Sequence, residues 1–188
     1  MTYNLLPDSP YPTYESYLER NGPSAVLMAG SLSPQDIVNE IQASGLRGRG
    51  GAGFPSGVKW KTILDHPCPI RYVVCNAAEG EPGTFKDRYL LRMNPYAVVE
   101  GLLIAAHVVG AKTIYIGIKA SFEREIDRLN QAVHQIISAV VDDFADRLFA
   151  DPKIGKYFVG MGTDTRDMFK QKNKNLRATR HVVNPVRS

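Results

Sequence analysis

Hydrophobic residues recur along this chain in two patterns. Apolar positions spaced as on one helix face predict helices at residues 14–20, 33–45, 96–109 and 121–140. Compact β-branched runs predict buried strands at residues 71–75 (RYVVC) and 113–118 (TIYIGI). Because helices separate the strands, we expect parallel pairing through right-handed crossovers. The pattern predicts an α/β fold, a Rossmann-like three-layer sandwich with a mainly parallel sheet.

The predicted helices differ in how much of their surface is apolar. Residues 14–20 end at Asn21 and Gly22, and we expect a short surface helix there. Residues 96–109 are apolar on nearly every side, which is typical of a helix buried against a sheet, with His107 in the core or at its rim.

Residues 47–60, RGRGGAGFPSGVKW, carry five glycines within ten residues. Such a backbone adopts positive φ readily and can lie close to a flat or phosphorylated ligand. Arg47, Arg49 and Lys59 add positive charge, and Phe54 and Trp60 offer rings that cover or stack on a planar ligand. The alternative is a flexible, solvated loop, but such a loop is usually richer in Ser, Asn and Asp. We therefore interpret this stretch as a cofactor cradle.

A second polar stretch, NAAEGEPGTFKDR at residues 76–88, directly follows the first predicted strand. Ligands of α/β proteins bind at the carboxyl ends of parallel strands, so we expect Asn76, Glu79 and Glu81 to share a crevice with the glycine loop. The alternative is a tight turn at Pro82 and Gly83 whose acids face water. The nearby glycine loop favours a binding role.

Composition and charge narrow the classes of function. The 188 residues suit one domain, and their net charge is +4. Residues 166–188 carry +6 of this charge, which leaves −2 on the rest, so nucleic-acid binding is disfavoured. No apolar run is long enough to span a bilayer and no signal segment is visible, so a cytoplasmic location is the default. Cys68 and Cys75 form no ligand set with the histidines, which argues against a metal site or a disulfide framework.

Four motifs together carry a family resemblance: SGLRGRGGAGFPSGVKW, VVCNAAEGEPGTFKDRYLL, NPYAVVEGLLIAAHVVGA and YIGIKASFEREIDRLNQAV. Over roughly residues 14–140 they resemble the FMN-binding domain of the NADH-oxidising flavoprotein subunit of respiratory complex I. NAD-linked hydrogenases and formate dehydrogenases carry similar subunits. The resemblance implies an NADH dehydrogenase flavoprotein component, in which NADH stacks on FMN and passes it a hydride. No side chain then needs to act as a catalytic acid or base.

The resemblance also assigns the candidate cofactor-binding residues. One group matches positions that hold FMN, and a second group matches positions that face the dinucleotide. The complete set is Gly48, Arg49, Gly50, Gly51, Phe54, Lys59, Asn76, Glu79 and Glu81. The second group consists of Phe54, Glu79 and Glu81. Ala78 departs from the family, which commonly has an aspartate there, so one flavin contact is expected to be weakened.

We expect the resemblance to end near residue 150, because other parts of the family pattern are absent from this chain. Family members continue with a further flavin-contacting segment, a β-rich domain and a helical domain that binds a [4Fe-4S] cluster. With two cysteines, this chain is expected to bind no such cluster alone. We expect an N-terminal extension with a short helix at residues 1–32, the FMN/NADH-binding domain at 33–150, and a basic tail at 151–188, with disorder as one alternative for the tail.

A truncation, a frameshifted end and a split gene each fit this pattern, and the choice stays open. Expected partners are NADH and a polypeptide that carries the remaining flavoprotein segments and the iron-sulfur cluster, or else a second copy of the chain. The resemblance implies a location peripheral to a membrane-bound complex. The alternative function is a non-catalytic remnant or an assembly module that needs a partner chain.

Overall fold

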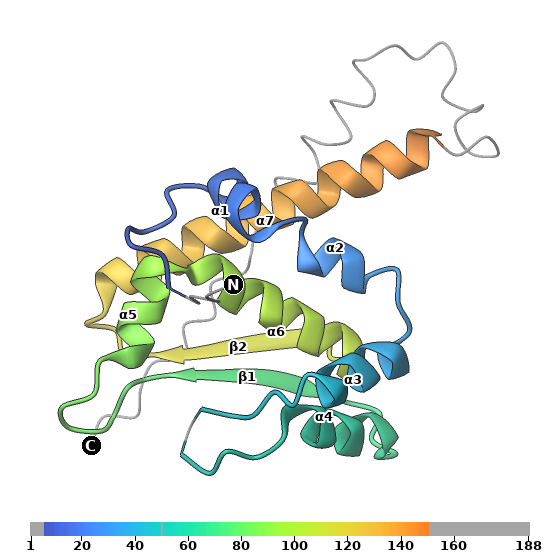
Figure 1. Ribbon diagram of the computed structural model, residues 1–188, viewed down its shortest axis with the longest axis horizontal. Helices are drawn as coiled ribbons and strands as arrows, with labels where there is room; N and C mark the ends of the chain where they lie inside the picture. Colours follow the sequence, from blue (N-terminus) through green and yellow to red (C-terminus); the bar gives the residue numbers. More distant parts are fainter. Residues whose placement is uncertain (1–5, 50, 151–188) are drawn as a thin grey trace.

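The computed structural model describes residues 6–49 and 51–150. It contains two strands and seven helices within these ranges (Figure 1). In chain order the elements are α1 (Tyr14–Asn21), α2 (Ala25–Ala29), α3 (Pro34–Ala43), α4 (Ser56–Asp65), β1 (Tyr72–Ala77), α5 (Lys86–Met93), α6 (Pro95–Val109), β2 (Thr113–Ile118) and α7 (Glu123–Ala150). The expected basic tail at residues 151–188 lies outside the described residues.

Local sequence signals explain where helices α3 and α6 begin. Ser33 caps α3 by accepting a hydrogen bond from the Asp36 N–H, and proline occupies the first helical position. Asn94 caps α6 in the same way, again followed by a proline. The sequence prediction missed α2, α4 and α5. Helix α4 has no side-chain cap at its N-cap residue Pro55, and α5 has none at Phe85, so the usual start signals are absent.

Strands β1 and β2 pair in parallel, with Tyr72 opposite Thr113 and Ala77 opposite Ile118. The inward residues of β1 pack beneath α6, and α7 packs against α6 in turn (Figure 1). On the other face of β1, Tyr72 and Val74 are 56% and 68% exposed. The α/β class is therefore confirmed, and the described residues form a sheet with helices over one face. A third layer is not among them.

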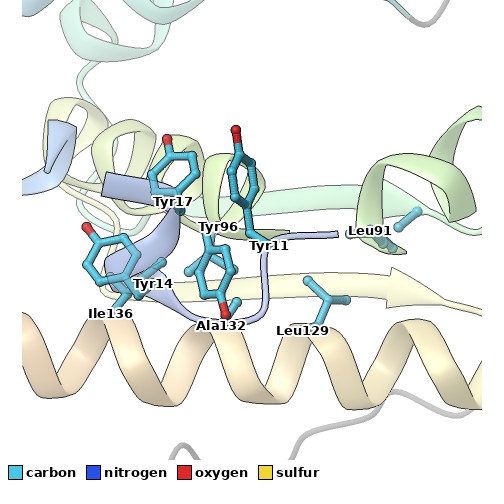
Figure 2. Close-up of a cluster of buried hydrophobic side chains, with 10 residues drawn as sticks. Tyr11, Tyr14, Tyr17, Leu91, Tyr96, Leu129, Ala132 and Ile136 are labelled. Atoms are coloured by element: carbon cyan, nitrogen blue, oxygen red, sulfur yellow. The ribbon is translucent and has the colours of Figure 1, made fainter. Parts of the chain in front are cut away.

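The main core is built on four tyrosines: Tyr11, Tyr14, Tyr17 and Tyr96. Figure 2 shows their rings above α7, whose Leu129, Ala132 and Ile136 point toward them. The first helix has one buried face, with Tyr14 and Tyr17, while Glu15, Glu19 and Arg20 of α1 are exposed, as expected of a surface helix.

A buried carboxylate helps to hold the tyrosine face of α1 against the core. Glu100 of α6 accepts hydrogen bonds from the hydroxyls of Tyr14 (2.6 Å), Tyr17 (3.0 Å) and Ser24 (2.9 Å). A buried carboxylate is costly unless its oxygens are hydrogen-bonded, and these three donors meet that need. The N-terminal segment is thus bound to α6 by both packing and polar contacts. Across the part of the chain that the structure describes, no helix is long and apolar enough to cross a membrane.

Candidate functional site

A pocket of about 550 Å³ lies where β1 ends. The glycine loop forms one side through Arg49 and Gly51, and the segment after β1 forms the other through Asn76, Glu79 and Glu81. Lys86, the first residue of α5, also lines it. The prediction that the two polar stretches share a crevice at the carboxyl end of a strand is confirmed.

The glycine loop connects α3 to α4 and is closed at its base by backbone hydrogen bonds. The Ser56 N–H donates to the Leu46 carbonyl and the Gly48 N–H donates to the Phe54 carbonyl, each at 2.9 Å. Gly51 and Gly53 have φ values of +107° and +61°, which only glycine adopts without strain. These two hydrogen bonds therefore join the two ends of the loop at its base. Gly50 lies outside the described residues.

Three residues of the predicted cradle are placed away from this pocket. Lys59 of α4 lines a separate hollow of about 580 Å³ beside β1, and Phe54 is 54% exposed without lining either space. Trp60 packs against a second buried cluster formed by α2, α3 and α6. The structure thus brings together Arg49, Gly51, Asn76, Glu79 and Glu81 and leaves Phe54 and Lys59 apart from them.

Glu79 holds the start of α5. Both of its carboxylate oxygens accept backbone hydrogen bonds, from the N–H groups of Asp87 and Arg88, each at 3.0 Å. Its own backbone has φ of +46°, and its carbonyl accepts a hydrogen bond from Lys119 Nζ at 3.1 Å. Sequence analysis missed this capping role because it did not predict α5. The N-cap residue Phe85 has no side-chain acceptor, so no local sequence signal pointed to the start of α5 or to Glu79 as its cap.

The environment of Glu79 favours its charged form. Burial by itself raises the pKa of this carboxyl, but the backbone N–H donors of Arg88 and Asp87, together with the charges of Lys86 and Arg88, outweigh burial. The net result is a pKa below the ordinary value. Glu79 therefore remains a carboxylate at neutral pH.

The other pocket residues present both hydrogen-bond donors and acceptors. Asn76 Oδ1 accepts from the Ala78 N–H at 3.2 Å, which leaves the amide NH₂ for other partners. Lys86 pairs with Asp87 at 2.8 Å, and this hydrogen bond is the main cause of a raised Lys86 pKa. Arg49 adds a second cation, and the Glu81 carboxylate is an acceptor in the same pocket.

These groups fit a phosphorylated ligand that carries hydroxyls, as FMN does. The pocket volume is within the ~300–1,000 Å³ typical of small-molecule sites. Arg49 and Lys86 suit a phosphate, the Asn76 NH₂ suits a ring carbonyl, and Glu81 suits a hydroxyl. Within the described ranges, no three His, Cys, Asp or Glu residues gather as metal ligands. Cys68 and Cys75 are free, and burial raises the pKa of the Cys75 thiol.

Comparison with known proteins identifies the family. The model of the Nuo51 FMN-binding domain matches residues 41–166, which is more than half of the chain. The chain belongs to this family. The family resemblance read from the motifs is confirmed. The expectation that it ends near residue 150 is wrong, because the match continues to residue 166.

Curated relatives of this FMN-binding domain include a subunit of the NADH-quinone oxidoreductase of Aquifex aeolicus (strain VF5). It is 37% identical over 150 residues, which are 80% of this chain and 32% of the relative. The NADH-quinone oxidoreductase of Escherichia coli (strain K12) has a similar subunit, 34% identical over 187 residues, which are 95% of this chain and 42% of the relative. The chain thus spans less than half the length of these relatives.

A solved structure of an NAD⁺-reducing [NiFe]-hydrogenase in its H₂-reduced state is also similar. The TM-score is 0.59 and the sequence identity is 35%, over 69% of this chain and 23% of the hydrogenase chain. The α/β arrangement described above is therefore shared with a member of a second class of NAD-linked enzyme.

Proposed function

We propose that this chain is the FMN- and NADH-binding domain of an NADH:acceptor oxidoreductase. The observation that carries the proposal is the single pocket that joins Arg49 and Gly51 of the glycine loop to Asn76 and Glu81 after β1. Membership of the Nuo51 FMN-binding family supports FMN as the resident cofactor. The names of the relatives support NADH as the donor.

In this proposal the chain's own residues bind and orient their ligands. Arg49 and Lys86 hold the phosphate, and the small residues Gly48, Gly50 and Gly51 let the backbone approach closely. Asn76 donates to the flavin ring. Phe54, Lys59 and Glu79 are assigned to ligand binding by the family resemblance. Bound FMN would supply the hydride chemistry. No residue of the pocket is assigned as a catalytic acid or base.

A flavin-loading experiment tests the proposal. The protein is mixed with excess FMN, free flavin is removed, and the visible spectrum is recorded with and without NADH. We expect partial occupancy, because Ala78 replaces a family acceptor and each missing hydrogen bond costs ~1 kcal/mol. Arg49→Gln should lower the retained flavin, whereas Arg124→Gln, on the exposed side of α7, should leave it unchanged.

The spectrum also separates the two candidate functions. Retained flavin that bleaches on addition of NADH supports the oxidoreductase. Colourless protein in both spectra supports the alternative, a non-catalytic remnant or assembly module. The exposed outer face of β1, with Tyr72 and Val74, is the observation that favours this alternative, because it suits a chain that functions only with a partner.

Glu81 is assigned to the ribose hydroxyls of NADH. Glu81→Gln should weaken NADH binding several-fold while leaving FMN binding nearly unchanged. It should also reduce any preference for NADH over NADPH, because it removes a charge that repels the 2′-phosphate. Glu19→Gln, on the exposed side of α1, serves as the matched control. Titration of each ligand by fluorescence measures both constants, and equal losses for FMN and NADH contradict the assignment.

The outer face of the sheet is assigned to a partner. Ile63, Ile70, Tyr72 and Val74 are large apolar residues exposed on or beside β1. A polypeptide with the remaining flavoprotein segments and an iron-sulfur cluster would cover these residues and complete the Rossmann-like three-layer sandwich. The assembled chain would then lie on the cytoplasmic side, at the periphery of a membrane complex. Self-association is the alternative occupant. A monomer at every concentration in light scattering, with no binding of a dye for apolar surfaces, contradicts both.

A further inference from the structure

Gly57 lies in the first turn of α4, where α4 packs against α3, and it is the one buried residue of α4. A Cβ atom at this position would lie 2.9 Å from the backbone nitrogen of Gln42 and 2.5 Å from its Cγ. Carbon atoms in ordinary contact are about 3.5–4.0 Å apart. Only glycine therefore allows α3 and α4 to touch backbone to backbone.

This contact lies beside the base of the glycine loop. The loop leaves the end of α3 and returns at Ser56, whose N–H donates to the Leu46 carbonyl. Gly57 follows Ser56 directly, so the separation of α3 and α4 at Gly57 sets the gap that the base of the loop spans. Arg49 and Gly51 of the same loop line the pocket, whereas Gly57 is not among the residues that line it.

We propose that Gly57 is a positioning residue of the cofactor pocket: by keeping α3 and α4 in backbone contact, it holds the glycine loop closed at its base and so places Arg49 and Gly51 beside Asn76. The effect on ligand binding rests on the proposed function. The effect on the loop does not, because it follows from backbone contacts alone.

Helix propensity and the helix contact predict opposite results for Gly57→Ala. Gly57 does not have a positive φ, so alanine fits its backbone, and alanine is favoured over glycine inside a helix by ~1 kcal/mol. Helix propensity alone therefore predicts that Gly57→Ala makes α4 more stable. The contact with Gln42 predicts that the first turn of α4 moves away from α3 by about 0.5 Å or more, because a backbone nitrogen cannot rotate aside.

The test uses amide hydrogen exchange by NMR on the full chain without ligand. In Gly57→Ala, the amide protons of Gly48 and Ser56, which close the loop, should exchange at least tenfold faster, while those of β1 keep their protection. Gly101→Ala is the matched control, since Gly101 is an exposed glycine of α6 with open space around its Cα. This control should leave the exchange at both loop positions unchanged.

A second measurement links the loop to the pocket. If the wild-type chain binds FMN, Gly57→Ala should raise the dissociation constant of FMN about tenfold or more, and Gly101→Ala should not change it. If the wild-type chain binds no FMN, the proposed function fails, and the exchange experiment still decides the role of Gly57 in the loop.

The double variant Gly57→Ala with Gln42→Ala covers the case in which the single variant does not fold. It removes the Cγ clash and keeps the clash with the backbone nitrogen, so we expect exchange at Gly48 and Ser56 between the wild-type and single-variant rates. Wild-type protection in either variant, or equal acceleration in β1 and at the loop, overturns the proposal.

Discussion

Replacing Glu79 with glutamine tests whether this carboxylate holds the start of α5. The side chain is 2% exposed, and its two oxygens accept the N–H groups of Asp87 and Arg88. Hydrogen bonds to a charged group contribute ~1.5–3 kcal/mol each, and a neutral one ~1 kcal/mol. Glutamine keeps one neutral acceptor, loses the other, and turns an NH₂ group toward a backbone N–H. It also removes a negative charge from the N-terminus of α5, where such a charge stabilises a helix by ~0.3–1 kcal/mol.

We therefore expect Glu79→Gln to lower the free energy of unfolding by about 2–3 kcal/mol at pH 7. The loss should depend on pH in a defined direction. Because the folded-state pKa of Glu79 lies below its ordinary value of about 4.3, the stabilisation by its charge is complete above that value and is lost as the pH falls through the folded-state pKa. The wild-type and variant curves should converge in acid.

Urea denaturation at several pH values between 7 and 3 measures this difference. Glu40→Gln is the control, because Glu40 is an exposed carboxylate of α3, and its effect should stay within ~0.5 kcal/mol. A loss at pH 7 no larger than the control, or a loss that is the same at pH 3 as at pH 7, would refute the capping role assigned to the Glu79 carboxylate.

Two further predictions concern stability. Arg71→Met should lower the free energy of unfolding by ~2–4 kcal/mol, because this guanidinium donates to three carbonyls at the C-terminal ends of α4 and α6. Thermal melting measures this loss, with the exposed residue Arg20 changed to Met as the control. Equal melting temperatures for the two variants contradict the prediction. Tyr14→Phe should cost ~1–3 kcal/mol by removing a donor to buried Glu100, whereas exposed Tyr89→Phe should be nearly neutral. Burial and Glu100 raise the pKa of Tyr14, so its contribution should persist up to about pH 10 and decline above it; a decline that begins near neutral pH contradicts this.

Much of the fold could be predicted from local sequence. The β-branched runs at 71–75 and 113–118 correspond to β1 and β2, and Ser33 with Pro34 marks the start of α3. These signals are readable because they act within a few residues through side-chain alternation and capping. Helices α4 and α5 were missed for the same reason, since neither has a local side-chain cap.

The shared crevice was also predictable, because parallel strands bring their carboxyl ends to one edge. What each residue does in that crevice was not. Glu79 and Glu81 are two acids in the same short segment, yet the carboxylate of Glu79 caps a helix that begins several residues later. Whether an acidic side chain faces a ligand or a backbone N–H depends on how the segment that follows it folds back in three dimensions.

By itself, the sequence determined the α/β class, the glycine loop, the segment after β1 and the family, because these rest on local patterns and ordered motifs. Only the tertiary structure decided which residues meet. The sequence predicted the short surface helix that carries Tyr14, but only the structure shows that the Tyr14 side chain is buried and that its hydroxyl meets Glu100, far along the chain in α6. In the sequence, Gly57 looks like any other glycine of the 47–60 stretch, and only the approach of α3 distinguishes it. Contacts between distant segments depend on how helices and strands pack in three dimensions, and local patterns do not record that packing.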